Sequence, residues 1–209
     1  MFMIYGGNPD NIWKRESALD RCLKSRIKSF GSLDSYFTFM RRYVTCAGGH
    51  PYENALDVGC GKAVVSTYLA SLGIIQNLTL LDKFQEILEK NRMYIATKCP
   101  GLNGRVYFVK KDVCKEPIDR KYDLVLASTV TRASELRRGN NKVENVFNAV
   151  DRNGRVIISV CLKAEGETFS DFRKQTIRKG IELLMDVYEI QFVGAAMGNE
   201  EIWVTGKRE

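Results

Sequence analysis

The stretch of this sequence with the clearest capacity for chemistry is ALDVGCGKAVV, residues 55–65. An acidic residue, Asp57, is followed closely by Gly59, Cys60 and Gly61. The apolar run before the glycines predicts a buried strand, and the run after them predicts a helix. Glycine permits the backbone angles of a tight turn, and its missing side chain lets a ligand approach the main chain. We therefore expect a ligand at this turn, although a plain strand-to-helix turn can also use glycine.

One class of ligand fits the spacing of this turn poorly. Dinucleotide cofactors favour the pattern G-x-G-x-x-G/A, because a small third residue lets the helix pack closely against the strand. Val64 stands at that third place in this chain. The turn therefore argues against NAD or FAD as the ligand.

The elements that must position this turn alternate along the chain. Strands are predicted at 55–59, 77–83, 105–112, 122–129, 155–162, 187–196 and 200–207. Helices are predicted at 63–73, 84–98, 142–150 and 169–186, with a turn at 151–154. Only MGN separates the last two strands, so they must form an antiparallel hairpin. The pattern predicts an α/β, Rossmann-like, doubly wound and mostly parallel seven-stranded sheet with an antiparallel C-terminal strand.

Four strand ends resemble, in order, the motifs of class I S-adenosylmethionine-dependent methyltransferases. They are LDVGCGKA, LTLLDK, FVKKDV and YDLVLAST, and the resemblance covers about residues 50–209. It implies S-adenosylmethionine as the cofactor, with Asp82 accepting hydrogen bonds from both ribose hydroxyls. It also implies that Asp112 accepts from the adenine amino group and that the Val113 N–H meets a ring nitrogen. A helix N-cap is the structural alternative for each aspartate. The implied cofactor-binding residues are Asp57, Gly59, Cys60, Gly61, Asp82, Lys83, Asp112, Val113 and Ala127.

The methyl acceptor is suggested by two further segments. NEEIWVTGK resembles the end of flavivirus-type RNA cap 2′-O-methyltransferases, whose Lys-Asp-Lys-Glu tetrad would place its glutamate at Glu200. The other tetrad members are not matched, since Ala127 or Ser128 stands at the aspartate and Ser159 is nearest to the second lysine. DNIWKRESALDRCLKSRIKS resembles the region before the donor domain in guanine-N7 cap methyltransferases, including viral ones.

Together these resemblances imply methylation of the RNA 5′ cap, at guanine N7 rather than at a ribose 2′-O. N7 carries a lone pair and loses no proton, whereas a ribose hydroxyl must be deprotonated. The candidate catalytic residues are Ser128, Thr129 and Glu200. The alternatives are a small-molecule or protein methyltransferase and a non-catalytic RNA-binding module of the same fold.

The N-terminal region is predicted to be helical and to contact the substrate. At 100° per residue, Leu19, Leu23, Ile27 and Phe30 share one helix face. Phosphate contacts are expected from the opposite face and aromatic stacking from the segment after it. The residues concerned are Lys14, Arg21, Lys24, Lys28, Tyr36 and Arg41. A solvated helix face is the alternative for the cations, and a place in the core is the alternative for most of the aromatic residues around Tyr36, among them Tyr43.

Composition sets the class of protein. The 209 residues suit a single domain, with 1–50 as a helical substrate-binding extension and 51–209 as the cofactor-binding core. The apolar runs are too short to span a membrane, and the N-terminus is too quickly polar for a secretory signal. The six cysteines have no CxxC pair and His50 is the single histidine, so a metal site is not expected.

The net charge of +7 favours a polyanionic partner such as RNA. We expect a cytoplasmic protein (host cytoplasm if viral) that can join other subunits of a viral replication complex.

Overall fold

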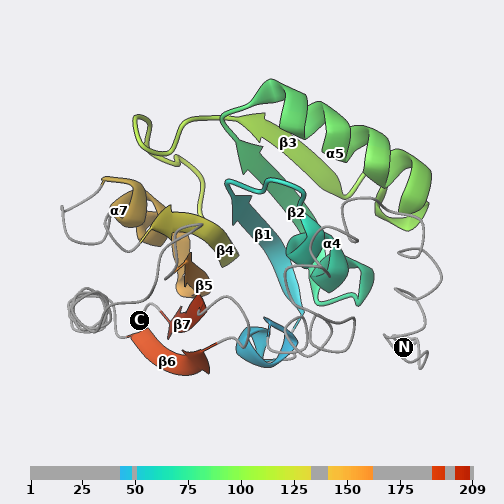
Figure 1. Cartoon of the computed structure of the whole chain (residues 1–209). Helices are drawn as coiled ribbons and strands as arrows, with labels where there is room; N and C mark the ends of the chain where they lie inside the picture. Colours follow the sequence, from blue (N-terminus) through green and yellow to red (C-terminus); the bar gives the residue numbers. More distant parts are fainter. Residues whose placement is uncertain (1–42, 49–50, 133–140, 162–189, 196–200, 208–209) are drawn as a thin grey trace.

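The computed structural model describes residues 43–48, 51–132, 141–161, 190–195 and 201–207 (Figure 1). A helical segment covers residues 43–47. The strands are β1 (Tyr52–Val58), β2 (Ile75–Asp82), β3 (Val106–Lys110), β4 (Tyr122–Arg132), β5 (Val150–Cys161), β6 (Ile190–Ala195) and β7 (Glu201–Lys207). The helices are α4 (Val64–Ser71), α5 (Gln85–Lys98), α7 (Asn141–Asn148) and the short 3₁₀ helix η1 (Pro100–Leu102).

The strands form one seven-stranded sheet in the order β3-β2-β1-β4-β5-β7-β6. Strands β1 to β5 pair in parallel along this order. Strand β7 is antiparallel to both of its neighbours, β5 and β6. The predicted fold class is therefore confirmed, including the C-terminal hairpin and its reversed strand.

The strand order explains which helices cover which face of the sheet. The chain moves from β1 outward to β2 and β3, then returns to β4 on the other side of β1 and continues to β5. Right-handed crossovers in opposite directions put the connecting helices on opposite faces. Helices α4 and α5 thus cover one face, and α7 covers the other beside β4 and β5 (Figure 1).

The core on the α4 and α5 face is apolar and tightly enclosed. Leu78 and Leu80 of β2 lie in one buried cluster with Leu88 and Ile95 of α5. Tyr43 and Ala47 of the helical segment at 43–47 belong to the same cluster, so this segment is an integral part of the core. The predicted core alternative is confirmed for Tyr43, whose side chain is fully buried.

Three predicted boundaries are wrong, and each shows how pairing overrides local sequence. The predicted turn at 151–154 lies inside β5, where Tyr122 pairs with Val150 and Leu124 with Arg155, leaving a bulge between them. Strand β4 continues to Arg132, beyond its predicted end at residue 129, so Ser128 and Thr129 lie within the strand and not at its end. Strand β3 ends at Lys110, and Asp112 belongs to the loop beyond it.

Several predicted residues lie outside the described part of the chain. These are Lys14, Arg21, Lys24, Lys28, Tyr36, Arg41, His50, Glu200 and the helix expected at 169–186. The side chain of Thr129 is likewise not described. Within the described residues, no helix has the length and apolar character needed to cross a membrane.

The packing of the β5 bulge leaves no room for a side chain at Gly154. A Cβ atom there would lie 2.7 Å from Val150 Cγ1, 2.9 Å from Tyr122 O and 3.0 Å from Asp123 O. Two of these atoms belong to the backbone and cannot move aside, so Gly154→Ala should reduce the free energy of unfolding by about 1–3 kcal/mol in urea denaturation.

Gly101→Ala is the matched control. A Cβ at Gly101 would meet no heavy atom of the described residues within 4 Å. This variant should stay within about 0.5 kcal/mol of the parent. Equal stability of the two variants would contradict the tight packing of the bulge.

Candidate functional site

The turn after β1 has the backbone geometry that only glycine adopts easily. The φ angles of Gly59 and Gly61 are 60° and 51°, both in the left-handed region. A Cβ on Gly61 would meet only the Gly59 carbonyl oxygen within 4 Å, at 3.9 Å. The described residues therefore leave the space above Gly61 open, and a ligand can lie directly against the main chain.

The turn is fixed to the neighbouring strand and helix through its own peptide groups. The Cys60 N–H donates to Leu81 O at 3.0 Å, and the Gly61 N–H donates to Asp82 Oδ2 at 3.1 Å. From α5, Asn91 Nδ2 donates to Gly61 O at 2.7 Å. Both peptide groups of Gly61 are thus held, one from the end of β2 and one from α5.

Asp82 organises the corner between β2, the turn and α5. Its side chain is only 6% exposed. One carboxylate oxygen accepts the Gly61 N–H, and the other accepts the Phe84 N–H at 3.0 Å. A carboxylate offers about four acceptor directions, so its capacity is not exhausted by these two main-chain donors. The N-cap alternative is wrong for Asp82, because the N-cap of α5 is Phe84 and, among the described residues, no side chain caps that helix.

Asp57 lies at the base of the turn and is 4% exposed. The Ser66 hydroxyl of α4 donates to its Oδ2 atom, which ties β1 to the first turns of that helix. Ala63, which lies in the sequence between Asp57 and Ser66, has a φ of 49°. A residue with a Cβ adopts this left-handed angle at a cost of about 1–2 kcal/mol. Strain of this kind is typical of functional turns that surrounding contacts hold in place.

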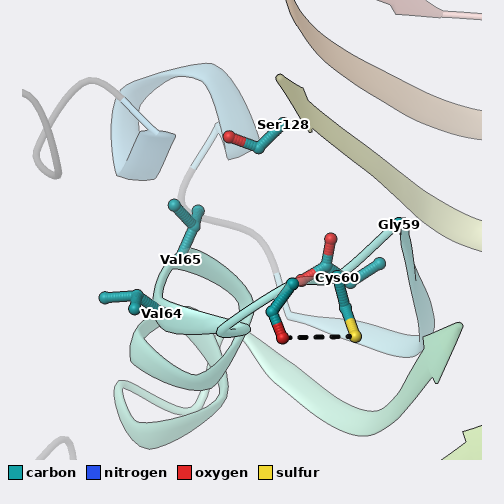
Figure 2. Close-up of a pocket in the computed structure, with 7 residues that line it drawn as sticks. Gly59, Cys60, Val64, Val65 and Ser128 are labelled. Carbon is teal, nitrogen blue, oxygen red and sulfur yellow. Dashed lines mark hydrogen bonds between the residues drawn. The ribbon is translucent and has the colours of Figure 1, made fainter. Parts of the chain in front are cut away.

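A pocket opens between the turn, the start of α4 and β4, as Figure 2 shows. Ser128 of β4 lies across this space from Cys60, with Val64 and Val65 of α4 along its side (Figure 2). Strands β1 and β4 are neighbours at the place where the strand order reverses. That place is where open α/β sheets bind their ligands. The lining residues are Asp57, Gly59, Cys60, Gly61, Val64, Val65 and Ser128.

The other predicted cofactor residues are not among those that line this pocket. The Lys111 N–H donates to Asp82 O at 3.1 Å, which starts the loop after β3 beside this corner. Asp112 Oδ1 accepts the Cys114 N–H at 3.1 Å, and Val113 O accepts from Asn145 of α7 at 2.8 Å. Ala127 is buried within β4. Lys83 is exposed, and its Nζ atom lies 4.9 Å from the centre of the Phe84 ring.

The environment of Cys60 disfavours the thiolate form that a base or nucleophile would need. Burial is the main cause that raises the pKa of its thiol, and the carboxylates of Asp57 and Asp82 raise it further. The side chain therefore stays a neutral thiol across the physiological pH range. Cys60 lines the pocket, and its sulfur accepts from Asn91 Nδ2 at 3.6 Å.

A family model for a methyltransferase domain matches residues 50–201. The chain belongs to the methyltransferase domain family. Its strand order with one reversed strand is the class I methyltransferase fold, as the resemblance in the sequence predicts. No curated protein sequence is significantly similar to the chain.

Solved structures of low sequence identity share this fold. The N-methyltransferase NodS from Bradyrhizobium japonicum WM9, in complex with S-adenosyl-l-homocysteine, is 12% identical with a TM-score of 0.62, covering 96% of this chain and 98% of NodS. A ribosomal protein L11 methylase from Lactobacillus delbrueckii subsp. bulgaricus is 17% identical (TM-score 0.53, covering 76% and 71%). An rRNA methylase from Streptococcus thermophilus is 12% identical (TM-score 0.53, covering 78% and 92%).

S-adenosylmethionine is the methyl donor of class I methyltransferase domains, and the residues of this methyltransferase domain fit it. The open main chain at Gly61 leaves room for a ligand beside the turn. The buried carboxylates of Asp57 and Asp82 favour a cationic ligand carrying hydroxyl donors. The residues that would hold the donor are therefore the turn itself, Asp57 and Asp82.

Two residues that shape this site, Ser66 and Asn91, are not predicted from the sequence, and Tyr43 is predicted only as a stacking or core residue. Asn91 has a recognisable signal, because it falls on the same face of α5 as Leu88 and Ile95 yet is polar and buried. Ser66 is likewise a buried polar residue in an apolar helix. A polar residue on a buried helix face needs a partner, and here the partner is the glycine turn or its aspartate.

Asp82→Asn should weaken donor binding and also loosen the turn. An amide offers one acceptor oxygen where the carboxylate offers two, so the Gly61 or Phe84 N–H loses its partner. Isothermal titration with S-adenosylhomocysteine should show an affinity loss of about 10- to 100-fold. Asp119→Asn removes the same charge from an exposed side chain bound to Lys111 and should leave the affinity unchanged. Equal affinities for the parent and the Asp82 variant would contradict the assigned role.

The raised pKa of Cys60 predicts its pattern of alkylation. At pH 8 iodoacetamide should label the exposed Cys114 and leave Cys60 unmodified, because only the thiolate reacts. Peptide mass spectrometry after short exposure measures both sites in one sample. If Cys60 were labelled as fast as Cys114 in the folded protein, the Cys60 thiol would not be buried and its pKa would not be raised.

Proposed function

We propose that this S-adenosylmethionine-dependent methyltransferase methylates RNA at N7 of the 5′ cap guanine. The observation that carries the proposal is the chemistry of the pocket wall. Of the described lining residues, only Asp57 and Cys60 can ionise. Asp57 is buried and bound by Ser66, and Cys60 stays a neutral thiol. This part of the pocket suits an acceptor that already carries a lone pair and needs no base.

The proposed reaction depends on placement. When bound, S-adenosylmethionine supplies an electrophilic methyl carbon on a sulfonium. The chain holds its nucleoside by Asp82 and the Gly59–Gly61 turn, so that the donor cannot shift along the crevice. Ser128 faces the same space from β4. Fixing both reactants in line removes the entropic cost of their encounter, which is the main catalytic contribution for a transfer without proton abstraction.

The strand positions of a 2′-O-methyltransferase tetrad carry small residues in this chain. Ala127 is fully buried and Ser128 follows it on β4. Ser159 of β5 is the register partner of Ser128. Neither strand offers the lysine or aspartate at these positions that would activate a ribose hydroxyl, which favours N7 over 2′-O as the acceptor.

The acceptor class rests on the resemblance of the N-terminal segment to guanine-N7 cap methyltransferases and on the net charge of +7. A positively charged protein gains affinity for RNA through its phosphates. A viral replication complex acting in the host cytoplasm is the setting that this proposal implies, with its other subunits as candidate partners.

Radiolabelled methyl transfer tests the proposal with three RNAs of one sequence: GpppA-capped, m7GpppA-capped and uncapped. We expect label on GpppA-RNA alone, and nuclease digestion should release labelled m7GpppA. Asp82→Asn, whose donor affinity is expected to be lower, is the control and should transfer less label at limiting donor.

Label on the premethylated cap would identify a 2′-O-methyltransferase. Label on uncapped RNA would show that the acceptor is a nucleotide of the RNA itself and not the cap. Absence of label on every RNA, from protein that binds S-adenosylhomocysteine, would overturn RNA as the acceptor and direct attention to small amines and proteins.

A further inference from the structure

A buried tyrosine reaches the pocket from outside the predicted cofactor-binding motifs. Tyr43 is 0% exposed, and its hydroxyl donates to Ser128 Oγ at 2.7 Å. The two residues are 85 positions apart in the sequence. A buried tyrosine hydroxyl needs a hydrogen-bond partner, and here the partner includes a residue that lines the pocket.

The helical segment that carries Tyr43 is fixed at its other end. Tyr52 donates its hydroxyl to Ala47 O at 2.6 Å, and Arg155 Nη1 donates to Cys46 O at 2.6 Å. These bonds satisfy carbonyl groups at the C-terminal end of the segment. The position of the Tyr43 hydroxyl is therefore fixed, and the Ser128 hydroxyl accepts its hydrogen bond at that position.

Ser128 also occupies a special place in β4. It pairs in register with Ser159, and the register then shifts before Thr131 pairs with Val160. A bulge next to a site commonly redirects a side chain. A serine side chain has three staggered rotamers, and a donor at a fixed position selects among them.

We propose that Tyr43 is a positioning residue that holds the Ser128 hydroxyl toward the reactants in the pocket. Ser128 faces the glycine turn across the space in which the donor is expected, so its orientation affects what meets the donor (Figure 2). The inference rests on the proposed function and adds a residue from the N-terminal segment to the transfer site. No proton is transferred by Tyr43, which acts only through Ser128.

The test is a double-mutant cycle of Tyr43→Phe and Ser128→Ala, with Tyr52→Phe as the matched control. Each single variant at the pair should lower kcat for the RNA that the parent methylates by about five- to tenfold, as expected for one lost hydrogen bond. The affinity for S-adenosylhomocysteine should change by less than about twofold. The double variant should be no worse than either single one, because the two side chains act as a unit. Urea unfolding should show coupling between the same two substitutions.

Tyr52→Phe removes a hydroxyl from the same segment but at the end away from the pocket. It should shift the urea midpoint and leave kcat unchanged. An unchanged kcat in Tyr43→Phe, equal kcat losses in Tyr43→Phe and Tyr52→Phe, or strictly additive effects in the cycle would each overturn the inference. If the parent protein methylates no RNA, the cap proposal is wrong. The double-mutant cycle measured by urea unfolding then still decides whether Tyr43 and Ser128 act as a pair.

Discussion

The carboxylate of Asp82 joins three parts of this molecule: the end of β2, the glycine turn after β1 and the start of α5. Its two oxygens accept main-chain N–H groups whose positions would otherwise be set only by a flexible turn. Because the carboxylate is buried, these bonds are stronger than they would be in water. The shape of the pocket beside Gly61 depends on this corner, and so does every role assigned to the residues around it.

Further contacts complete the frame around the corner. Asn91 holds the carbonyl side of Gly61, and Ser66 holds Asp57 at the base of the turn. On the opposite wall, Tyr43 holds Ser128. The pocket is thus prepared before any ligand enters, so little of the binding energy is spent on ordering the site. A methyl transfer that needs no base benefits most from such preorganisation, since placement is its main requirement.

The sequence predicts the fold and the turn well because both depend on local patterns. Alternating apolar runs locate the strands, the short MGN connection requires a hairpin, and glycines at 59 and 61 adopt the positive φ angles of a tight turn. The failures concern pairings between distant segments. No local signal shows that residues 151–154 form a bulge in β5, or that Tyr43 meets Ser128. The double use of Asp82 as support and candidate ligand-binding group also emerges only when β2 and the turn lie side by side.

The central claim is that the glycine turn and Asp82 together bind the adenosyl group of the methyl donor. A crystal structure of the full chain with S-adenosylhomocysteine tests it most directly. We expect the homocysteine portion against the Gly59–Gly61 main chain and both ribose hydroxyls within hydrogen-bond distance of Asp82. The bonds from Asp82 to Gly61 and Phe84 should be intact. A nucleoside bound elsewhere, or an Asp82 carboxylate turned away from the ribose, would contradict it.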